Sequence, residues 1–453
     1  MCKLFGTDGV RGVANRNLKP ELAMKIGRAG AYALAGHLGK SPNILIGTDT
    51  RLSADMLEAA LVAGLCSVGA TVHRAGVLPS PAMSYLVRHY KMDAGVMLSA
   101  SHNPMQDNGI KFFDENGYKL SDEMEAEIEA FMGEKESDIP RPEGIDVGRS
   151  FLCKEAVADY VSFLAGTVIG DKPFLGIKVG LDCANGACCE AAPIIFKQLG
   201  ADVFPIHHKP SGININVKCG STNVKSLQAY VKENHLDIGL AFDGDGDRIA
   251  CVDENGAEVD GDKIMAVCGL ALKSKGRLKN NTIVATIMSN LGFQMLCEKE
   301  GINLLRTKVG DRYVIQEMKA NGYNLGGEQS GHIIFHDYNT TGDGILTGLQ
   351  VLATLKESGK KFSELSAVME TMPQVLLGVK LDSMLKSDIR ENENIDRAIK
   401  EIEQQFADGS GRVLVRPSGT EPLIRVMVEG RDRDVILGLA QKLVNVIEKE
   451  MAV

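Results

Sequence analysis

AGVMLSASHNP (residues 94–104) is an apolar run that ends abruptly in a polar turn. The run has the length and composition of a buried strand, and its Asn-Pro pair favours a turn directly after it. Similar apolar strands are predicted at residues 43–46 and 71–73, with a helical period between them at about 53–68 and another helix opening at Pro20. Short strands that alternate with helices indicate an α/β domain.

The same alternation recurs twice along the chain. The second round has strands at 177–181, 201–205 and 238–242 and a helix at 191–198; the third has strands at 282–286 and 302–306 and helices at 290–299 and 342–355. The last part differs, with strands near 375–381, 412–415 and 424–429, a helix near 395–406 and a terminal helix, which is an α+β order. We therefore expect three similar mixed-sheet α/β domains at 1–155, 156–257 and 258–370, and an α+β domain at 371–453.

Composition excludes several classes of protein. The 453 residues are 44% hydrophobic and 24% charged, as in ordinary globular chains, and 50 basic against 59 acidic residues give a net charge of −9. This balance argues against a nucleic-acid partner. No apolar run is long enough for a signal peptide or a membrane span, so we expect a cytoplasmic protein.

The ten cysteines are scattered and form no paired CxxC motif. Cys183, Cys188 and Cys189 cluster in the sequence, and we interpret them as free buried thiols rather than as a zinc or disulfide site. Free thiols fit a reducing compartment.

The serine turn at residues 99–104 lies beyond a strand end, where open α/β sheets bind ligands. Ser101 is therefore a candidate nucleophilic or phosphorylated serine; the alternative is a turn serine with a local hydrogen bond. A Ser101–His102 hydrolase pair is disfavoured, because neighbours in an extended turn point apart and no G-x-S-x-G elbow is present.

DGDGDR (residues 243–248) also follows an apolar strand. Asp243, Asp245 and Asp247 at alternate positions can converge on one hard cation, and the glycines let the loop curl. An EF-hand is excluded because its sixth position holds Arg248 instead of glycine and the flanks read as strands. The alternative is an acidic surface turn, in which the carboxylates would repel one another.

Two further loops carry polar groups. GGEQSGH (residues 326–332) offers Glu328 and Ser330 for sugar hydroxyls and His332 for titration near neutral pH. RPSGTEP (residues 416–422) offers backbone N–H groups, hydroxyls and a guanidinium to a phosphate. Both can also be purely structural turns.

Two smaller elements complete the set. FGTDGVRG (residues 5–12) is a glycine-rich, charged opening, and GIK (residues 109–111) follows the serine turn closely enough to bring an ammonium to it. For each, a solvated surface loop is the alternative.

These motifs, taken in order, resemble those of the α-D-phosphohexomutase superfamily from end to end. Within it, residues 5–12, 99–104, 327–332 and 416–430 look like the bacterial phosphoglucosamine mutases. The resemblance implies four domains around a central cleft. It implies an isomerase-class intramolecular phosphotransferase that interconverts glucosamine 6-phosphate and glucosamine 1-phosphate. That step leads toward UDP-N-acetylglucosamine and cell-wall precursors.

The resemblance also implies roles for the singled-out residues. Ser101 would carry a phosphoryl group, and the three aspartates with one phosphate oxygen would hold one Mg²⁺. A free hydroxyl of the substrate would attack to give a hexose 1,6-bisphosphate, which must turn around because a single serine serves both ends.

The remaining residues would bind the sugar or move its proton. Glu328 and Ser330 would hold sugar hydroxyls and Arg248 the phosphoserine, while the phosphate clamp comprises Arg416, Ser418, Gly419, Thr420 and Arg425. His102, Lys111, Arg11 and His332 are all open candidates for proton transfer.

Other functions remain open at this point. A phosphomannomutase or phosphoglucomutase would keep the chemistry and change the sugar. A phosphoserine-using phosphatase would release free phosphate, and a non-catalytic phosphosugar-binding protein would be expected to lack the serine or the metal loop. A homodimer is left open.

Overall fold

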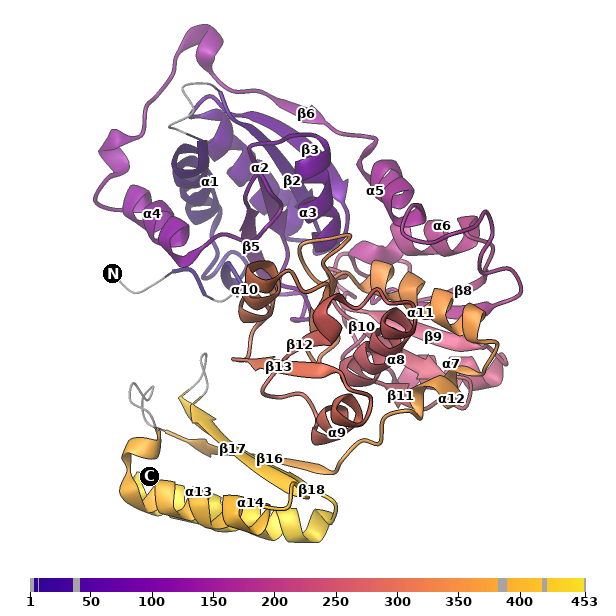
Figure 1. The fold of residues 1–453 in the computed structure, drawn as a ribbon. Coiled ribbons are helices and arrows are strands. Elements are labelled where there is room, and N and C mark those ends of the chain that lie inside the picture. The colour runs from indigo at the N-terminus through magenta and orange to yellow at the C-terminus, as the bar shows by residue number, and fades with distance from the viewer. Residues whose placement is uncertain (1–3, 7, 36–40, 382–388, 418–421, 452–453) are drawn as a thin grey trace. The chain divides into compact units, whose positions relative to one another are not determined.

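The structure is a computed structural model that describes residues 4–6, 8–35, 41–381, 389–417 and 422–451 (Figure 1). Its contacts divide the chain into two compact units. The first comprises Met1–Met288 and Ile302–Val368, and the second comprises Ser289–Gly301 and Met369–Val453.

The first sheet has six strands in the order β1-β5-β4-β2-β3-β6. Its strands are β1 (Val10–Val13), β5 (Asp107–Phe113), β4 (Ala94–Leu98), β2 (Asn43–Thr48), β3 (Thr71–Val77) and β6 (Ser150–Leu152). Strands β4, β2, β3 and β6 are parallel, whereas β5 is antiparallel to both β4 and β1. Residues 10–12 of the glycine-rich opening and residues 109–111 therefore belong to paired strands and are not solvated loops.

Helices cover both faces of this sheet, which explains why its central strands are continuously apolar. Ile44 and Ile46 of β2 face a core formed with α1 (Pro20–Ala35), α2 (Ala54–Cys66) and α4 (Asp122–Met132). Gly47, the next residue along β2, faces α3 (Ser80–His89) on the opposite side of the sheet. An added Cβ at Gly47 would meet Met83 of α3. A Cβ at Gly64 of α2 would lie 2.1 Å from the Met24 carbonyl oxygen, so glycine is required for the close α1–α2 packing.

Two smaller sheets complete the first unit. One has the order β11-β10-β9-β7-β8, and its strands are β11 (Glu258–Val259), β10 (Ile249–Asp253), β9 (Ile238–Phe242), β7 (Lys178–Asp182) and β8 (Asp202–Ile206). The other has the order β13-β12-β14-β15, with β13 (Asn303–Thr307), β12 (Thr282–Thr286), β14 (Leu325–Gly327) and β15 (Ile333–Phe335). Their helices are α5 (Ala156–Ala165), α6 (Ala191–Gln198), α7 (Lys225–Glu233), α8 (Gly261–Ser274), α10 (Asp311–Asn321), α11 (Gly344–Ser358) and α12 (Phe362–Ser366).

The second unit is built on the antiparallel sheet β16-β18-β17, whose strands are β16 (Gln374–Lys380), β18 (Leu423–Gly430) and β17 (Gly411–Pro417). Helices α13 (Glu393–Gln405) and α14 (Arg433–Glu450) lie against this sheet (Figure 1). Ile395, Ile399 and Ile402 of α13 recur at helical spacing and are fully buried in the core of the unit. Asn392 caps α13 by accepting hydrogen bonds from two backbone N–H groups.

The order of elements agrees with the α/β and α+β architecture expected from the sequence. One helix is grouped differently: α9 (Leu291–Lys299) was expected with its neighbours β12 and β13 but belongs by its contacts to the second unit. Asn290 illustrates this, because its amide nitrogen donates to the Met372 carbonyl at 3.0 Å. No helix in the described ranges is long and apolar enough to cross a membrane.

Candidate active site

The serine turn and the aspartate loop meet inside the first unit. Each loop follows the carboxyl end of a strand, β4 for the serine turn and β9 for the aspartate loop. The Ser101 hydroxyl donates a hydrogen bond of 2.6 Å to Oδ2 of Asp243, and both residues are buried. The two motifs, 142 residues apart in the chain, therefore form a single site.

The serine turn has a backbone conformation that residues other than glycine rarely adopt. Ser101 has φ +52°, in the left-handed region. The Arg51 guanidinium donates to the carbonyls of Ser101 and Asn103, each at 2.8 Å, and Asn216 donates to the Ser101 carbonyl at 2.8 Å. Surrounding contacts thus over-determine the strained turn, as is typical of functional sites.

A buried chain of polar groups supports Arg51 and leads back to the serine. Asp49 accepts hydrogen bonds from Nε of Arg51 at 2.8 Å and from the Ser99 hydroxyl at 2.6 Å. Oγ of Ser99 in turn accepts the Ser101 N–H at 2.9 Å. Neither Arg51 nor Asp49 was singled out from the sequence, because their role depends on contacts with a turn 50 residues away.

The three aspartates of the loop are buried and close together, with carboxylate oxygens within 4.8 Å of one another. Burial, reinforced by the charges of Asp247 and Asp245, raises the pKa of Asp243 well above its usual value. Among the described residues, Oδ1 of Asp245 and Oδ1 of Asp247 are buried without a hydrogen-bond partner. Buried carboxylate oxygens close together and without hydrogen-bond partners suit a hard divalent cation.

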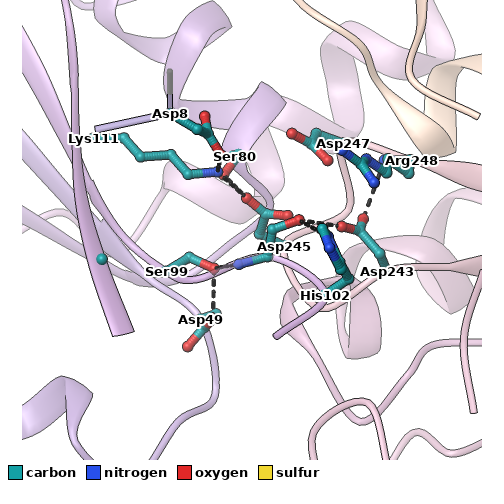
Figure 2. A network of polar contacts seen from close by, with 12 residues as sticks. Asp8, Asp49, Ser80, Ser99, His102, Lys111, Asp243, Asp245, Asp247 and Arg248 are labelled. Carbon is teal, nitrogen blue, oxygen red and sulfur yellow. Dashed lines mark hydrogen bonds and ion pairs between the residues drawn. The ribbon is translucent and has the colours of Figure 1, made fainter. Parts of the chain in front are cut away.

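Lys111, on β5, supplies a fixed positive charge to this cluster. Its ammonium lies 2.8 Å from Oδ2 of Asp245 and 3.0 Å from Oδ2 of Asp8 (Figure 2). Burial alone would lower the pKa of Lys111, but Asp245 and Asp8 outweigh it and raise the pKa, so the amine stays protonated. Arg11 also pairs with Asp8.

His102 lies beside the serine, contrary to the expectation that neighbouring side chains point apart. Its Nδ1 is 3.3 Å from the Ser101 hydroxyl. The left-handed φ of Ser101 explains this approach, since the turn is not extended there. Burial first, then Arg248 and Arg11, lower the pKa of His102 to about 4, so its imidazole is neutral at pH 7.

His332 contacts the far side of the aspartate cluster. Its Nδ1 is 3.5 Å from Oδ2 of Asp247, and its Nε2 is 3.7 Å from Oδ2 of Asp311. Nε2 accepts the Gly342 N–H at 3.0 Å, and the carboxylates raise the pKa of His332 against the opposing effect of burial. A cavity of about 210 Å³ beside it is lined by, among others, Tyr118, Lys119, Asp311, Arg312, His332 and Thr341.

The other expected binding residues are only partly described. Glu328 lies between β14 and β15, where its Oε1 accepts the Gly310 N–H at 3.2 Å and burial raises its pKa; Ser330 is exposed. The Arg248 backbone N–H donates to Oδ1 of Asp243 at 3.1 Å.

In the second unit, Arg416 and Arg425 are directly opposite each other on β17 and β18. Burial, and then Arg425, lower the pKa of Arg416. Like charges in such a pair are destabilising unless an anion lies between them. Ser418, Gly419 and Thr420 lie outside the described residues.

Family models match the chain in four consecutive parts. They are the phosphoglucomutase/phosphomannomutase alpha/beta/alpha domains I, II and III at residues 2–138, 158–256 and 260–372, and the C-terminal domain at 376–446. A fold of this kind, with a buried serine on a three-aspartate cluster, defines the phosphohexomutase class.

Curated relatives narrow the class. The phosphoglucosamine mutase of Ruminiclostridium cellulolyticum is 56% identical to this chain, and the alignment covers 100% of both chains. The phosphoglucosamine mutase of Bacillus subtilis is 53% identical, and the alignment covers 100% of this chain and 99% of the relative. The chain belongs to the phosphoglucosamine mutase family.

Solved structures share the fold at lower identity. A phosphoglucomutase/phosphomannomutase family protein of Burkholderia thailandensis has a TM-score of 0.81 at 21% identity, covering 99% of this chain and 97% of its own. Aspergillus fumigatus N-acetylphosphoglucosamine mutase, in complex with GlcNAc-6P and magnesium, has a TM-score of 0.71 at 19% identity, covering 98% and 95%.

Proposed function

We propose that this protein interconverts glucosamine 6-phosphate and glucosamine 1-phosphate as an intramolecular phosphotransferase, and thereby feeds UDP-N-acetylglucosamine synthesis in the cytoplasm. The observation that carries the proposal is the 2.6 Å contact between the Ser101 hydroxyl and Asp243, at the edge of three buried carboxylates. A serine in that position can accept a phosphoryl group whose charge a cation beside it offsets.

Asp243, Asp245 and Asp247, together with one oxygen of phosphorylated Ser101, would hold one Mg²⁺. The hydrogen-bond-free oxygens of Asp245 and Asp247 support this assignment. When bound, the cation would stabilise negative charge on the transferring phosphoryl group. Arg248, held to Asp243 through its backbone N–H, would orient the phosphoserine.

The two transfers balance in atoms and protons. In the first, a sugar hydroxyl forms a bond to phosphorus, the Ser101 O–P bond breaks, and the hydroxyl proton ends on the serine oxygen. In the second, Ser101 attacks the other phosphate of the 1,6-bisphosphate and its proton ends on the sugar. We assign the serine end of this proton movement to His102, because its imidazole is neutral and 3.3 Å from the hydroxyl.

Binding residues must accept the sugar in both orientations, because one serine serves two ends. We assign the sugar hydroxyls to Glu328 and Ser330. The phosphate distant from Ser101 would bind Arg416 and Arg425, whose cross-strand pairing brings two guanidinium groups together, with Ser418, Gly419 and Thr420. The four domains at 1–155, 156–257, 258–370 and 371–453 would each contribute one of these loops.

Glucosamine is chosen over mannose and glucose because of the 53–56% identity to phosphoglucosamine mutases. The test compares isomer formation from the 6-phosphates of glucosamine, mannose and glucose with Mg²⁺, using Ser101→Ala as the control for contaminating activity. The highest kcat/KM should belong to glucosamine 6-phosphate. A higher value for either other sugar would overturn the sugar assignment, and release of free phosphate without an isomer would indicate a phosphatase.

A further inference from the structure

A second cluster of metal-binding side chains lies in the β7–β8–β9 region, apart from the aspartate loop. Asp182 ends β7, His207 directly follows β8, and Cys219 lies in the connection that leads to α7. Their carboxylate, imidazole and thiol ligand atoms all lie within 4.8 Å of one another. None of the three takes part in the transfer chemistry described above.

The geometry of the cluster suits a small cation. Nδ1 of His207 is 3.1 Å from Oδ1 of Asp182, close enough to form an ion pair when the imidazole is protonated and to share a cation when it is neutral. In a tetrahedral zinc site, bonds of roughly 2.0–2.3 Å place ligand atoms about 3.3–3.8 Å apart. A small adjustment would therefore bring all three ligand atoms onto one ion.

The Asp182 carboxylate is already oriented by the backbone. Its Oδ1 accepts the Ala184 N–H at 3.0 Å and its Oδ2 accepts the Gly220 N–H at 2.9 Å. Metal-binding carboxylates are commonly held in this way by hydrogen bonds outside the ligand shell. Because the Gly220 N–H follows Cys219 directly, the same contact also fixes the backbone of the thiol ligand.

The donor set selects the kind of metal. Imidazole and thiolate favour zinc and similar transition metals, whereas Mg²⁺ prefers oxygen ligands alone. The charges also balance, because one carboxylate and one thiolate neutralise a divalent ion at a place where Asp182 and Cys219 are both fully buried.

Another thiol, that of Cys189, lies near the backbone of His207. Sγ of Cys189 is 3.9 Å from the backbone carbonyl oxygens of both His207 and Cys183. Cys189 is not among the side chains whose ligand atoms lie within 4.8 Å of one another, so a water molecule would complete four-coordination.

We propose that Asp182, His207 and Cys219 form a second metal site, for Zn²⁺ or a similar soft divalent cation. The site would connect loops that support the active site. Asn216, between His207 and Cys219 in the chain, donates to the Ser101 carbonyl at 2.8 Å, and the Ala187 N–H donates to the Gly244 carbonyl of the aspartate loop at 2.8 Å. Occupancy would therefore stiffen the segments that hold both the serine turn and the aspartate loop.

The test is a Co²⁺ titration of the full-length protein with Mg²⁺ in excess, followed by absorption spectroscopy. The wild type should bind one equivalent with a cobalt–thiolate charge-transfer band and intense tetrahedral d–d bands. Cys219→Ser and His207→Gln should weaken this binding by more than about tenfold. Cys66→Ser, which removes a half-buried thiol of α2, and Asp243→Asn, which alters the aspartate loop, should both keep the band.

Absence of the thiolate band in the wild type would overturn the proposal, as would an unchanged band in both ligand variants. A weak oxygen-type spectrum that disappears in Asp243→Asn would mean binding to the aspartate loop only, and would also overturn it. If Cys219→Ser fails to fold by circular dichroism, His207→Gln decides, because that side chain is 30% exposed. None of these readouts depends on mutase activity.

Discussion

The Lys111 ammonium lies 2.8 Å from Oδ2 of Asp245, and each side chain is at least 98% buried. This contact makes the three aspartates unequal. Burial would raise the pKa of Asp245, but Lys111 and the Ser80 hydroxyl lower it below its ordinary value. Among the described residues no lysine or arginine side chain lies within ion-pair distance of Asp243, and burial raises its pKa. Lys111 thus favours the ionised form of Asp245, whereas burial disfavours the ionised form of Asp243.

Replacing Lys111 should therefore make stability depend on added metal. Lys111→Met leaves the buried Asp245 without its cation, which typically costs about 3–5 kcal/mol, whereas Asp8 keeps Lys119 and Arg11. We expect the melting temperature to fall in EDTA and to recover partly in Mg²⁺, as measured by calorimetry. Lys154→Met, an exposed lysine, should melt like the wild type in both solutions. Equal melting of Lys111→Met and wild type in EDTA would contradict this account.

Ser101→Ala should abolish phosphoryl transfer without unfolding the protein. The substitution keeps a Cβ at the same φ and removes the donor to Asp243, so turnover should fall by at least roughly 10³-fold. Intact mass spectrometry before and after incubation with glucosamine 6-phosphate and Mg²⁺ checks the assignment. The wild type should carry a substoichiometric phosphate and Ser101→Ala none, with exposed Ser137→Ala as the control. A phosphate that persists in Ser101→Ala would place the nucleophile elsewhere.

Arg51→Lys tests whether the serine turn needs the several N–H donors of the Arg51 guanidinium group. Lysine keeps the charge but not the planar guanidinium that serves several carbonyls at once. A small displacement of Ser101 should lower kcat by about 10–100-fold with less effect on KM. Arg16→Lys, at an exposed arginine, is the matched control. Unchanged kcat in Arg51→Lys would show that Asn216 and the backbone suffice.

Asp343 gives a pH dependence of stability beside the aspartate loop, because the N–H of the next residue, Gly344, donates to the Gly246 carbonyl at 2.9 Å. It caps α11 and accepts 2.9 Å hydrogen bonds from the Tyr160 hydroxyl, yet burial raises its pKa to about 6. The folded state therefore binds a proton that the unfolded chain has lost between pH 4 and 6. Its contribution is present at low pH and is lost as pH rises through about 6, by up to about 3 kcal/mol.

Asp343→Asn removes this titration while keeping a residue that caps helices well. Relative to the wild type, the variant should gain more in denaturant midpoint at pH 7.5 than at pH 4.5. A difference that is the same at both pH values would show that Asp343 does not titrate in this range.

Sequence reasoning succeeded where the signal is local. The strands at 94–98 and 238–242 match β4 and β9, because an uninterrupted apolar run followed by Gly, Ser, Asp or Asn defines both the strand and its end. The serine and aspartate loops follow from those ends. Their meeting, at Ser101 and Asp243, required the three-dimensional structure.

Sequence reasoning failed where the informative contacts exist only in the folded chain. Cysteine spacing along the chain does not connect Cys219 with Asp182 and His207, because the three residues come from separate segments. Asp49 and Arg51 look like ordinary charged residues after a strand, and only burial makes their contacts informative. The His102–Ser101 contact depends on a single backbone angle that no residue pattern indicates.

The excursion of residues 289–301 into the second unit means that the chain passes between the two units three times, at 288/289, 301/302 and 368/369. A truncation after Val368 would therefore not remove a whole module, because α9 would stay behind without Met372, to which Asn290 is bonded. Any change in orientation between the units must turn about three peptide connections at once. The second unit is consequently joined to the first by three covalent connections. Insertion of a flexible linker at one of them would leave the other two unchanged.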